Sequence, residues 1–424
     1  MQKVPYIVHC EWWAPEGIER FSCEKRPGTL TWSGENPSQL EIIYPYNNFL
    51  CRHIYHHYDV IWGKDASGVE YTLFEVDMTD SIYSGNINTN KFQIGYIIIG
   101  AHIISPNKHL FEKSTIEFPF LKNWAYNKFI VASETRDYIN LSVPKTQLVT
   151  LLDCKYSDEF EIALTGQYQM HFTLHKAEID ISTYLNLYSN TPKSIKEFWA
   201  MINEFSWFLS VVLYKKQFPC KISFYSNNRG KEIVMLFTHR NSENPSFCQL
   251  VKFDDFKHKI PSMLQNWHQN YVSMIPIVKC LLASVNRKSH FEANDFLTLA
   301  HSLDGYFKRF LNKKDGKDTR KYKDEIKKIL KRFENVEVIN KCKINIDELA
   351  DSRDAYTHLI PNDDKKLKNV LSGSDLFWLS KKCQVLLTCC ILDILGLTSE
   401  EINNCCNTSP ISNLMNEIIH NSEF

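Results

Sequence analysis

The sequence has no net charge, no long apolar run and no pair of cysteines with C-x-x-C spacing, and each absence excludes a class of protein. The 424 residues include 49 lysines and arginines and 49 aspartates and glutamates. The net charge is therefore zero, and it does not indicate a strongly charged partner such as nucleic acid. The most apolar stretches, residues 94–101 and 207–214, are far too short to span a bilayer. No charged and then apolar signal pattern follows Met1, and we expect a cytoplasmic protein with no membrane partner.

The cysteines and the missing motifs narrow the chemistry further. There are 13 cysteines, an odd number, and in a chain of this size they are best interpreted as reduced core residues, with a structural zinc site as the alternative. Gly-rich phosphate loops, G-x-S-x-G elbows and zinc-hydrolase patterns are also missing. An ATP-driven or serine-hydrolase mechanism therefore has no support, and we expect a function without cofactor or metal.

The first 185 residues have the period-two pattern of β-strands. Strand candidates of alternating or apolar character occur at residues 29–32, 40–44, 60–62, 71–74 and 92–99. Asp65-Ala66-Ser67-Gly68 predicts a hairpin turn. Apolar residues alternate again from Phe160 to Ile181, and Thr165-Gly166 predicts a turn between two of these strands. Many short strands separated by turn signals are typical of a sandwich or a barrel.

The period changes at Thr191-Pro192, where Thr191 is expected to cap a helix over residues 192–213. Residues 222–225 and 233–237 then predict a hairpin, and from residue 253 the pattern is helical almost to the end. Asn345, with Glu348 three residues later, predicts a capped helix start. The predicted fold class is α+β and multidomain, with a β-rich, sandwich- or barrel-like domain over residues 1–255 and an all-α helical bundle over residues 256–424.

Within the helical half, Arg353, Asp354 and His358 form an R-x4-H arrangement. Histidine changes charge near neutral pH and can transfer a proton, while the planar arginine cation binds phosphate with two hydrogen bonds. The spacing alone proves little, because Arg52 and His57 repeat it in the strand-rich region. The plain alternative is an ion pair and a histidine that cap a helix end.

An all-α domain with R-x4-H and a polar residue after the arginine resembles a HEPN domain. The N-terminal pattern narrows the resemblance to ApeA-like proteins, in which a β-rich domain precedes the HEPN domain. The segments that carry it are Trp12-Trp13-Ala14-Pro15-Glu16, Pro27-Gly28-Thr29-Leu30, Leu40-Glu41-Ile42, Ile61-Trp62-Gly63, Tyr71-Thr72-Leu73, Gly100-Ala101-His102, and Phe118-Pro119-Phe120-Leu121 ending at Trp124.

This resemblance implies an endoribonuclease that aborts phage infection by cleaving tRNA or mRNA, commonly as a homodimer with a composite site. It assigns catalysis to Arg353, His358 and the polar Asp354, which stands where asparagine is frequent. Family members often carry a glutamate in an earlier helix, and Asp304 is the corresponding support residue here. We expect the β-rich domain to sense or regulate, through autoinhibition or a phage-derived activator.

The chemistry of RNA agrees with a metal-free site. RNA carries its own nucleophile, the 2′-hydroxyl, so the protein must supply proton transfer, charge stabilisation and alignment. His358 would transfer protons, Arg353 would hold the phosphate, and Asp354 would orient Arg353 or a histidine. Five residues turn a helix by about 500°, so the two side chains diverge by about 140° unless the helix breaks near Thr357. The other solution is a dimer in which two Arg353 and two His358 share one site.

Residues 308–332 carry a net charge of +8 and are the one strongly basic segment. They predict an RNA-backbone track, in which we name Lys313, Lys314, Lys317, Arg320 and Lys321; the alternative is a solvated helix face.

Two other functions fit the same sequence. One is a non-catalytic HEPN module that binds RNA or a protein, and the other is a ligand receptor that dimerises through its helical half. The cluster of His53, His56 and His57 is best interpreted as ordinary structure rather than a metal site. The tryptophans of the first domain, Trp12 and Trp124 among them, favour core packing over a ligand groove.

Overall fold

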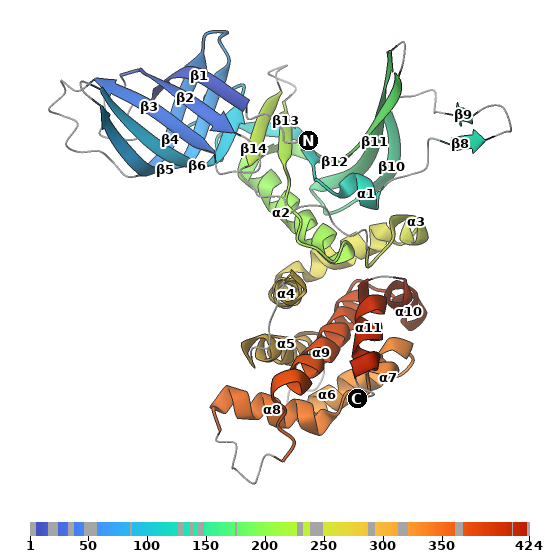
Figure 1. Ribbon diagram of the computed structural model, residues 1–424. Coiled ribbons are helices and arrows are strands. Elements are labelled where there is room, and N and C mark those ends of the chain that lie inside the picture. The colour runs from blue at the N-terminus through green and yellow to red at the C-terminus, as the bar shows by residue number, and fades with distance from the viewer. Residues whose placement is uncertain are drawn as a thin grey trace. The chain divides into compact units, whose positions relative to one another are not determined.

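The chain forms a strand-rich part followed by a helical part, which confirms the predicted fold class (Figure 1). The computed structural model describes residues 6–15, 24–32, 38–45, 57–84, 87–125, 131–134, 139–142, 148–173, 176–226, 232–237, 249–286, 293–312, 321–360, 368–408 and 410–421. The chain divides into two compact units, Met1–Asn203 with Phe218–Pro245 and Glu204–Gln217 with Ser246–Phe424. The domain boundary between residues 255 and 256 stays a prediction.

The first unit consists of antiparallel strands. They are β1 (Tyr6–Trp13), β2 (Arg26–Trp32), β3 (Gln39–Pro45), β4 (His57–Asp65), β5 (Glu70–Ser84), β6 (Ile87–Ile99), β7 (Leu110–Glu117), β8 (Val131–Glu134), β9 (Ile139–Ser142), β10 (Leu148–Lys155), β11 (Phe160–Thr173), β12 (Lys176–Ser194), β13 (Lys221–Tyr225) and β14 (Ile233–Phe237), with the short helix α1 (Leu121–Trp124) after β7. Strands β1 to β6 close into a barrel in the order β1-β2-β3-β6-β5-β4, because β4 pairs with β1 and β5 with β6. The sheet then continues from β6 through β14, β13, β7, β12 and β11 to β10.

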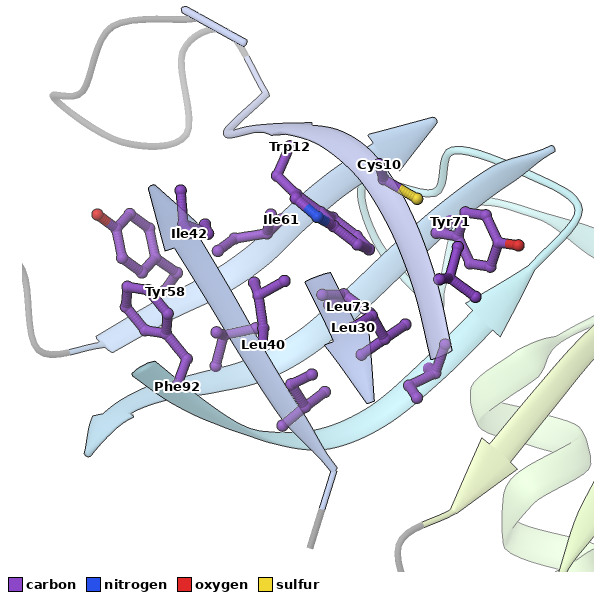
Figure 2. Packing of buried hydrophobic residues seen from close by; sticks show 14 of the residues in the cluster. Cys10, Trp12, Leu30, Leu40, Ile42, Tyr58, Ile61, Tyr71, Leu73 and Phe92 are labelled. Carbon is purple, nitrogen blue, oxygen red and sulfur yellow. The ribbon is translucent and has the colours of Figure 1, made fainter. Parts of the chain in front are cut away.

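The barrel interior is filled by the apolar side chains that the period-two pattern directs inward (Figure 2). Trp12 is the largest of them and is only 1% exposed. Its ring lies where side chains of Gly63 and Gly28 would project, since a Cβ on Gly63 would come within 2.2 Å of the indole and one on Gly28 within 2.8 Å. Two glycines thus make room for one tryptophan, and the interior is a packed core.

The predicted hairpin turn at Asp65–Gly68 is confirmed, as is the β13–β14 hairpin. The Asp65 carboxylate accepts hydrogen bonds from the backbone N–H groups of Ser67 and Val69, both at 2.9 Å, which is the Asx-turn chemistry that favours aspartate there. The strands on either side, β4 and β5, extend beyond the residues that the apolar pattern marked.

Two local predictions in this unit are wrong. Thr165-Gly166 is not a turn, because both residues lie inside β11 and pair with Tyr184 and Thr183 of β12. Thr191 does not cap a helix either: β12 continues to Ser194, which pairs with Leu110 after a bulge, and α2 (Ile195–Val212) begins at the next residue. The cap is Ser194, whose hydroxyl and backbone N–H both bind the Glu197 carboxylate.

The second unit is helical, as predicted. Its elements after α2, which contributes residues to both units, are α3 (Phe253–Phe256), α4 (Ile260–Asn286), α5 (Ala293–Tyr306), the π-helical turn η2 (Phe307–Leu311), α6 (Tyr322–Arg332), α7 (Glu337–Cys342), α8 (Ile346–His358), α9 (Gly373–Ile394), α10 (Ser399–Asn407) and α11 (Pro410–Asn421). Helix α9 is central, since it packs against α4, α5, α7, α10 and α11. Its side chains Cys383, Leu386, Leu387 and Cys390 are fully buried, and the cysteines in the described part of the chain form no disulfide with one another.

Candidate functional site

Helix α8 carries the R-x4-H residues, and both of its ends are defined by the backbone. Asn345 caps its first turn by accepting hydrogen bonds from the backbone N–H groups of Asp347 and Glu348, as the sequence predicted. The helix runs unbroken through His358 and ends at Leu359, which has left-handed backbone angles (φ 50°). The break near Thr357 that would have brought Arg353 and His358 together is therefore not present.

Contacts on the buried side of α8 fix the orientation of this helix about its own axis. Ser352 is completely buried and its hydroxyl accepts the backbone N–H of Leu371 at 2.9 Å. Asp351 accepts a hydrogen bond from the Asn369 amide at 2.9 Å and pairs with Lys323 of α6 at 3.0 Å. These contacts on the turn before Arg353 determine which way its side chain leaves the helix.

Arg353 is held in a defined orientation. Its Nη1 donates to Asp354 Oδ1 at 2.8 Å, and its guanidinium lies 5.1 Å from the ring centroid of Tyr322. The Tyr322 hydroxyl donates to the Ala300 carbonyl at 3.1 Å, so the ring itself is anchored. Arg353 Nε is buried and has no hydrogen-bond partner among the described residues. Asp354 is thus hydrogen-bonded to the cation, and its role in a reaction stays a prediction.

Two carboxyl groups lie beside this cation. Asp304 on α5 pairs with Lys308 at 2.9 Å and forms a hydrogen bond with Glu325 of α6, which is only 5% exposed. Burial, and then the contact with Asp304, raise the pKa of Glu325 to about 7, while the charges of Lys308 and Arg353 lower it. Asp304 and Arg353 therefore both lie close enough to Glu325 to affect its pKa. The sequence analysis did not identify Glu325. An acidic residue among the buried apolar positions of α6 is the feature that could have indicated it.

His301 is a second residue that the sequence did not identify. It precedes Asp304 by three residues on α5, so the two share a helix face. Its Nε2 lies 3.4 Å from the hydroxyl of Thr357 on α8. Partial burial and the charge of Arg353 lower the pKa of His301, and Asp304 opposes them. Helices α5, α6 and α8, which pack against one another, thus place a histidine, a carboxyl pair and an arginine together.

His358 lies apart from this cluster. It is an exposed residue in the last turn of α8, and within the part of the chain that the structure describes no hydrogen bond or ion pair joins it to a member of the cluster. On a continuous helix its side chain diverges from that of Arg353 by about 140°. One protomer alone does not bring the two motif residues face to face.

The basic segment is partly used in local contacts. Arg332 makes two 2.8 Å hydrogen bonds to Asp393, and Lys323 pairs with Asp347 at 2.8 Å. Lys321 is the exposed residue before α6. The other predicted RNA contacts lie outside the described residues; they are Lys313, Lys314, Lys317 and Arg320.

The histidines near residue 55 do not form a described metal site. Arg52, His53 and His56 lie outside the described residues, and His57 is an exposed residue that contacts Asp77 at 2.6 Å and Asp59 at 3.3 Å. The Asp77 hydrogen bond raises the pKa of His57. No group of metal-binding side chains is present among the described residues, and no described helix has the length and apolarity needed to cross a membrane.

The Glu325 carboxyl predicts a pH dependence of stability. Its pKa is raised from 4.5 to about 7 on folding, so the folded chain binds the extra proton in that range and the unfolding free energy falls as pH rises through it. The effect is on the order of 3 kcal/mol, and Glu325→Gln, which is neutral at every pH, should remove it. Thermal unfolding of both proteins at pH 5 and pH 8 measures this. Exposed Glu400→Gln is the control, and an unchanged pH dependence in Glu325→Gln would contradict the interpretation.

Comparison with known families agrees with the two-part architecture. The family model of the ApeA N-terminal domain 1 matches residues 8–267, and that of the Apea-like HEPN matches residues 286–401. All residues of the cluster around Arg353 fall within the second match. No curated protein and no solved structure matches the chain.

Proposed function

Because the chain belongs to the ApeA family and carries an Apea-like HEPN domain, we propose that it is an anti-phage defence protein that cleaves RNA. The observation that supports cleavage best is the cluster around Arg353. A guanidinium that lies over the Tyr322 ring, is hydrogen-bonded to Asp354 and belongs to a side chain that is 23% exposed is suited to bind a phosphate oxygen.

In this proposal the RNA supplies the nucleophile and the protein supplies the protons. The 2′-oxygen attacks the adjacent phosphorus, the bond from phosphorus to the 5′-oxygen breaks, and a 2′,3′-cyclic phosphate and a 5′-hydroxyl are formed. Arg353 stabilises the charge that develops on the phosphate, and His358 transfers a proton. Asp354 is a positioning residue that orients Arg353. No step needs a metal or a cofactor.

The divergence of Arg353 and His358 on α8 favours a site shared between two copies of the chain. His358 and its neighbour Leu359, which is 86% exposed, stand at the open end of the helix, where the partner's residues would meet them. We expect active protein to have twice the 49.7 kDa chain mass by light scattering. Activity per chain should fall on dilution, and full activity in a strictly monomeric protein would refute the shared site.

The ends of the cleaved RNA test the proposed chemistry. During phage infection, cells that contain the wild-type protein should accumulate RNA ending in 2′,3′-cyclic phosphate, and cells with His358→Ala should not. Equal phage protection by both proteins without such ends would instead assign the helical domain to binding RNA or a protein partner.

A further inference from the structure

Among the described residues, His301 is a histidine that contacts the Arg353 side of α8. Arg353 and Thr357 are four residues apart and therefore share a face of this helix. His301 of α5 meets that face, since its Nε2 lies 3.4 Å from Thr357 Oγ1. His358 leaves the helix about 140° away from Arg353.

We propose that His301 is a second catalytic residue of this site, which takes the proton of the RNA 2′-hydroxyl while Arg353 holds the adjacent phosphate. The inference rests on the proposed ribonuclease function and deepens it. It assigns the general base to a residue of α5 and leaves His358, from either protomer, as the general acid.

The surroundings of His301 suit a base. The residue is solvent-accessible, so a substrate can reach it. Among the described residues, Arg353 and Asp304 are the charged groups that affect it, and Lys308 and Glu325 contact Asp304. Partial burial and the Arg353 cation favour the uncharged ring, which is the form that accepts a proton. When His301 Nε2 donates a hydrogen bond to the Thr357 hydroxyl, Nδ1 carries the lone pair that accepts the proton of the 2′-hydroxyl.

The reaction balances with these two histidines. His301 removes the proton from the 2′-oxygen as the bond from that oxygen to phosphorus forms. The bond from phosphorus to the 5′-oxygen breaks, and His358 gives its proton to the departing oxygen. The products are a 2′,3′-cyclic phosphate and a 5′-hydroxyl, and the histidines return to their first protonation states by exchange with water.

The experiment compares RNA cleavage by wild type, His301→Gln, His301→Ala, Thr357→Val and His358→Ala, with purified protein and in infected cells. We expect both His301 variants to lose about 100-fold or more in rate and to lose the acidic limb of the pH–rate profile. Imidazole added to His301→Ala should restore part of the activity. Thr357→Val should lose less than about tenfold and keep that limb. His258→Gln, an exposed histidine before α4, is the control.

The outcomes separate the two proposals. Melting temperatures within a few degrees of wild type show that a variant is folded, and imidazole rescue distinguishes a catalytic loss from a structural one. Full activity and an unchanged pH profile in His301→Gln, beside an inactive His358→Ala, would overturn the role of His301 and leave the ribonuclease intact. Loss without rescue and with an unchanged pH profile would also overturn it. Wild-type protein that is silent in every condition would overturn the ribonuclease itself, and the role of His301 with it.

Discussion

Arg353→Ala and His358→Ala should each reduce RNA cleavage by about 100-fold or more at neutral pH. Removal of Arg353 withdraws the charge that stabilises the transition state, and removal of His358 withdraws a proton-transfer group; each contribution is typically worth about 10²- to 10⁴-fold. Single-turnover cleavage of labelled RNA under identical conditions measures the loss for each variant.

Arg353→Lys is the matched variant for the first of these. It keeps the positive charge but loses the planar fork and the fit over the Tyr322 ring, so we expect activity between wild type and Arg353→Ala. Stability should change little, because the stacking contact of a partly exposed cation contributes only about 1 kcal/mol. Equal activity of Arg353→Ala and wild type, with both folded, would remove Arg353 from the reaction.

Trp12→Ala should destabilise the β-barrel more than any other single truncation that we propose. The indole is 1% exposed and fills the space that Gly63 and Gly28 leave open, so alanine would create a large cavity. Such truncations cost about 3–5 kcal/mol, which corresponds to a fall in melting temperature on the order of 10 °C. Thermal unfolding followed by tryptophan fluorescence and circular dichroism measures this change.

Two further substitutions test the reason for that loss. Ile7→Ala on the same strand removes an exposed side chain (54% exposed) and should change the unfolding free energy by less than about 0.5 kcal/mol. Gly63→Ala should destabilise the wild-type barrel by about 1–3 kcal/mol, because its new methyl group would meet the indole. The same change should cost less in the Trp12→Ala background, and additive effects would contradict the packing account.

Local patterns predicted the elements but not how they pair. An apolar run located the strand at Phe92, alternation located the strands after Phe160, and Asp65 to Gly68 specified a turn by its own side-chain chemistry. The closure of the barrel depends on β1 pairing with β4 and on β5 pairing with β6, which no local pattern encodes. Thr165-Gly166 has a turn-like composition, yet pairing with β12 on a long hairpin outweighs that preference.

The same limit applies to the candidate site. The R-x4-H spacing identified Arg353 and His358, and the resemblance identified Asp304, because each lies in a recognisable stretch of sequence. His301 and Glu325 lie about 50 and 30 residues before Arg353 along the chain, and they reach its surroundings only when α5, α6 and α8 pack together. A carboxyl group within an apolar stripe and a histidine one turn before Asp304 were visible in the sequence, but only tertiary packing gives them a shared location.

The most direct test of the account is cleavage of labelled RNA in EDTA by wild-type protein beside Arg353→Ala and His358→Ala. The proteins are taken from phage-infected cells, so that any activator is present. The account predicts that wild type alone cuts the RNA and leaves 2′,3′-cyclic phosphate ends. Cleavage that is equal in all three proteins, or that disappears in EDTA, would contradict a metal-independent site built on Arg353 and His358.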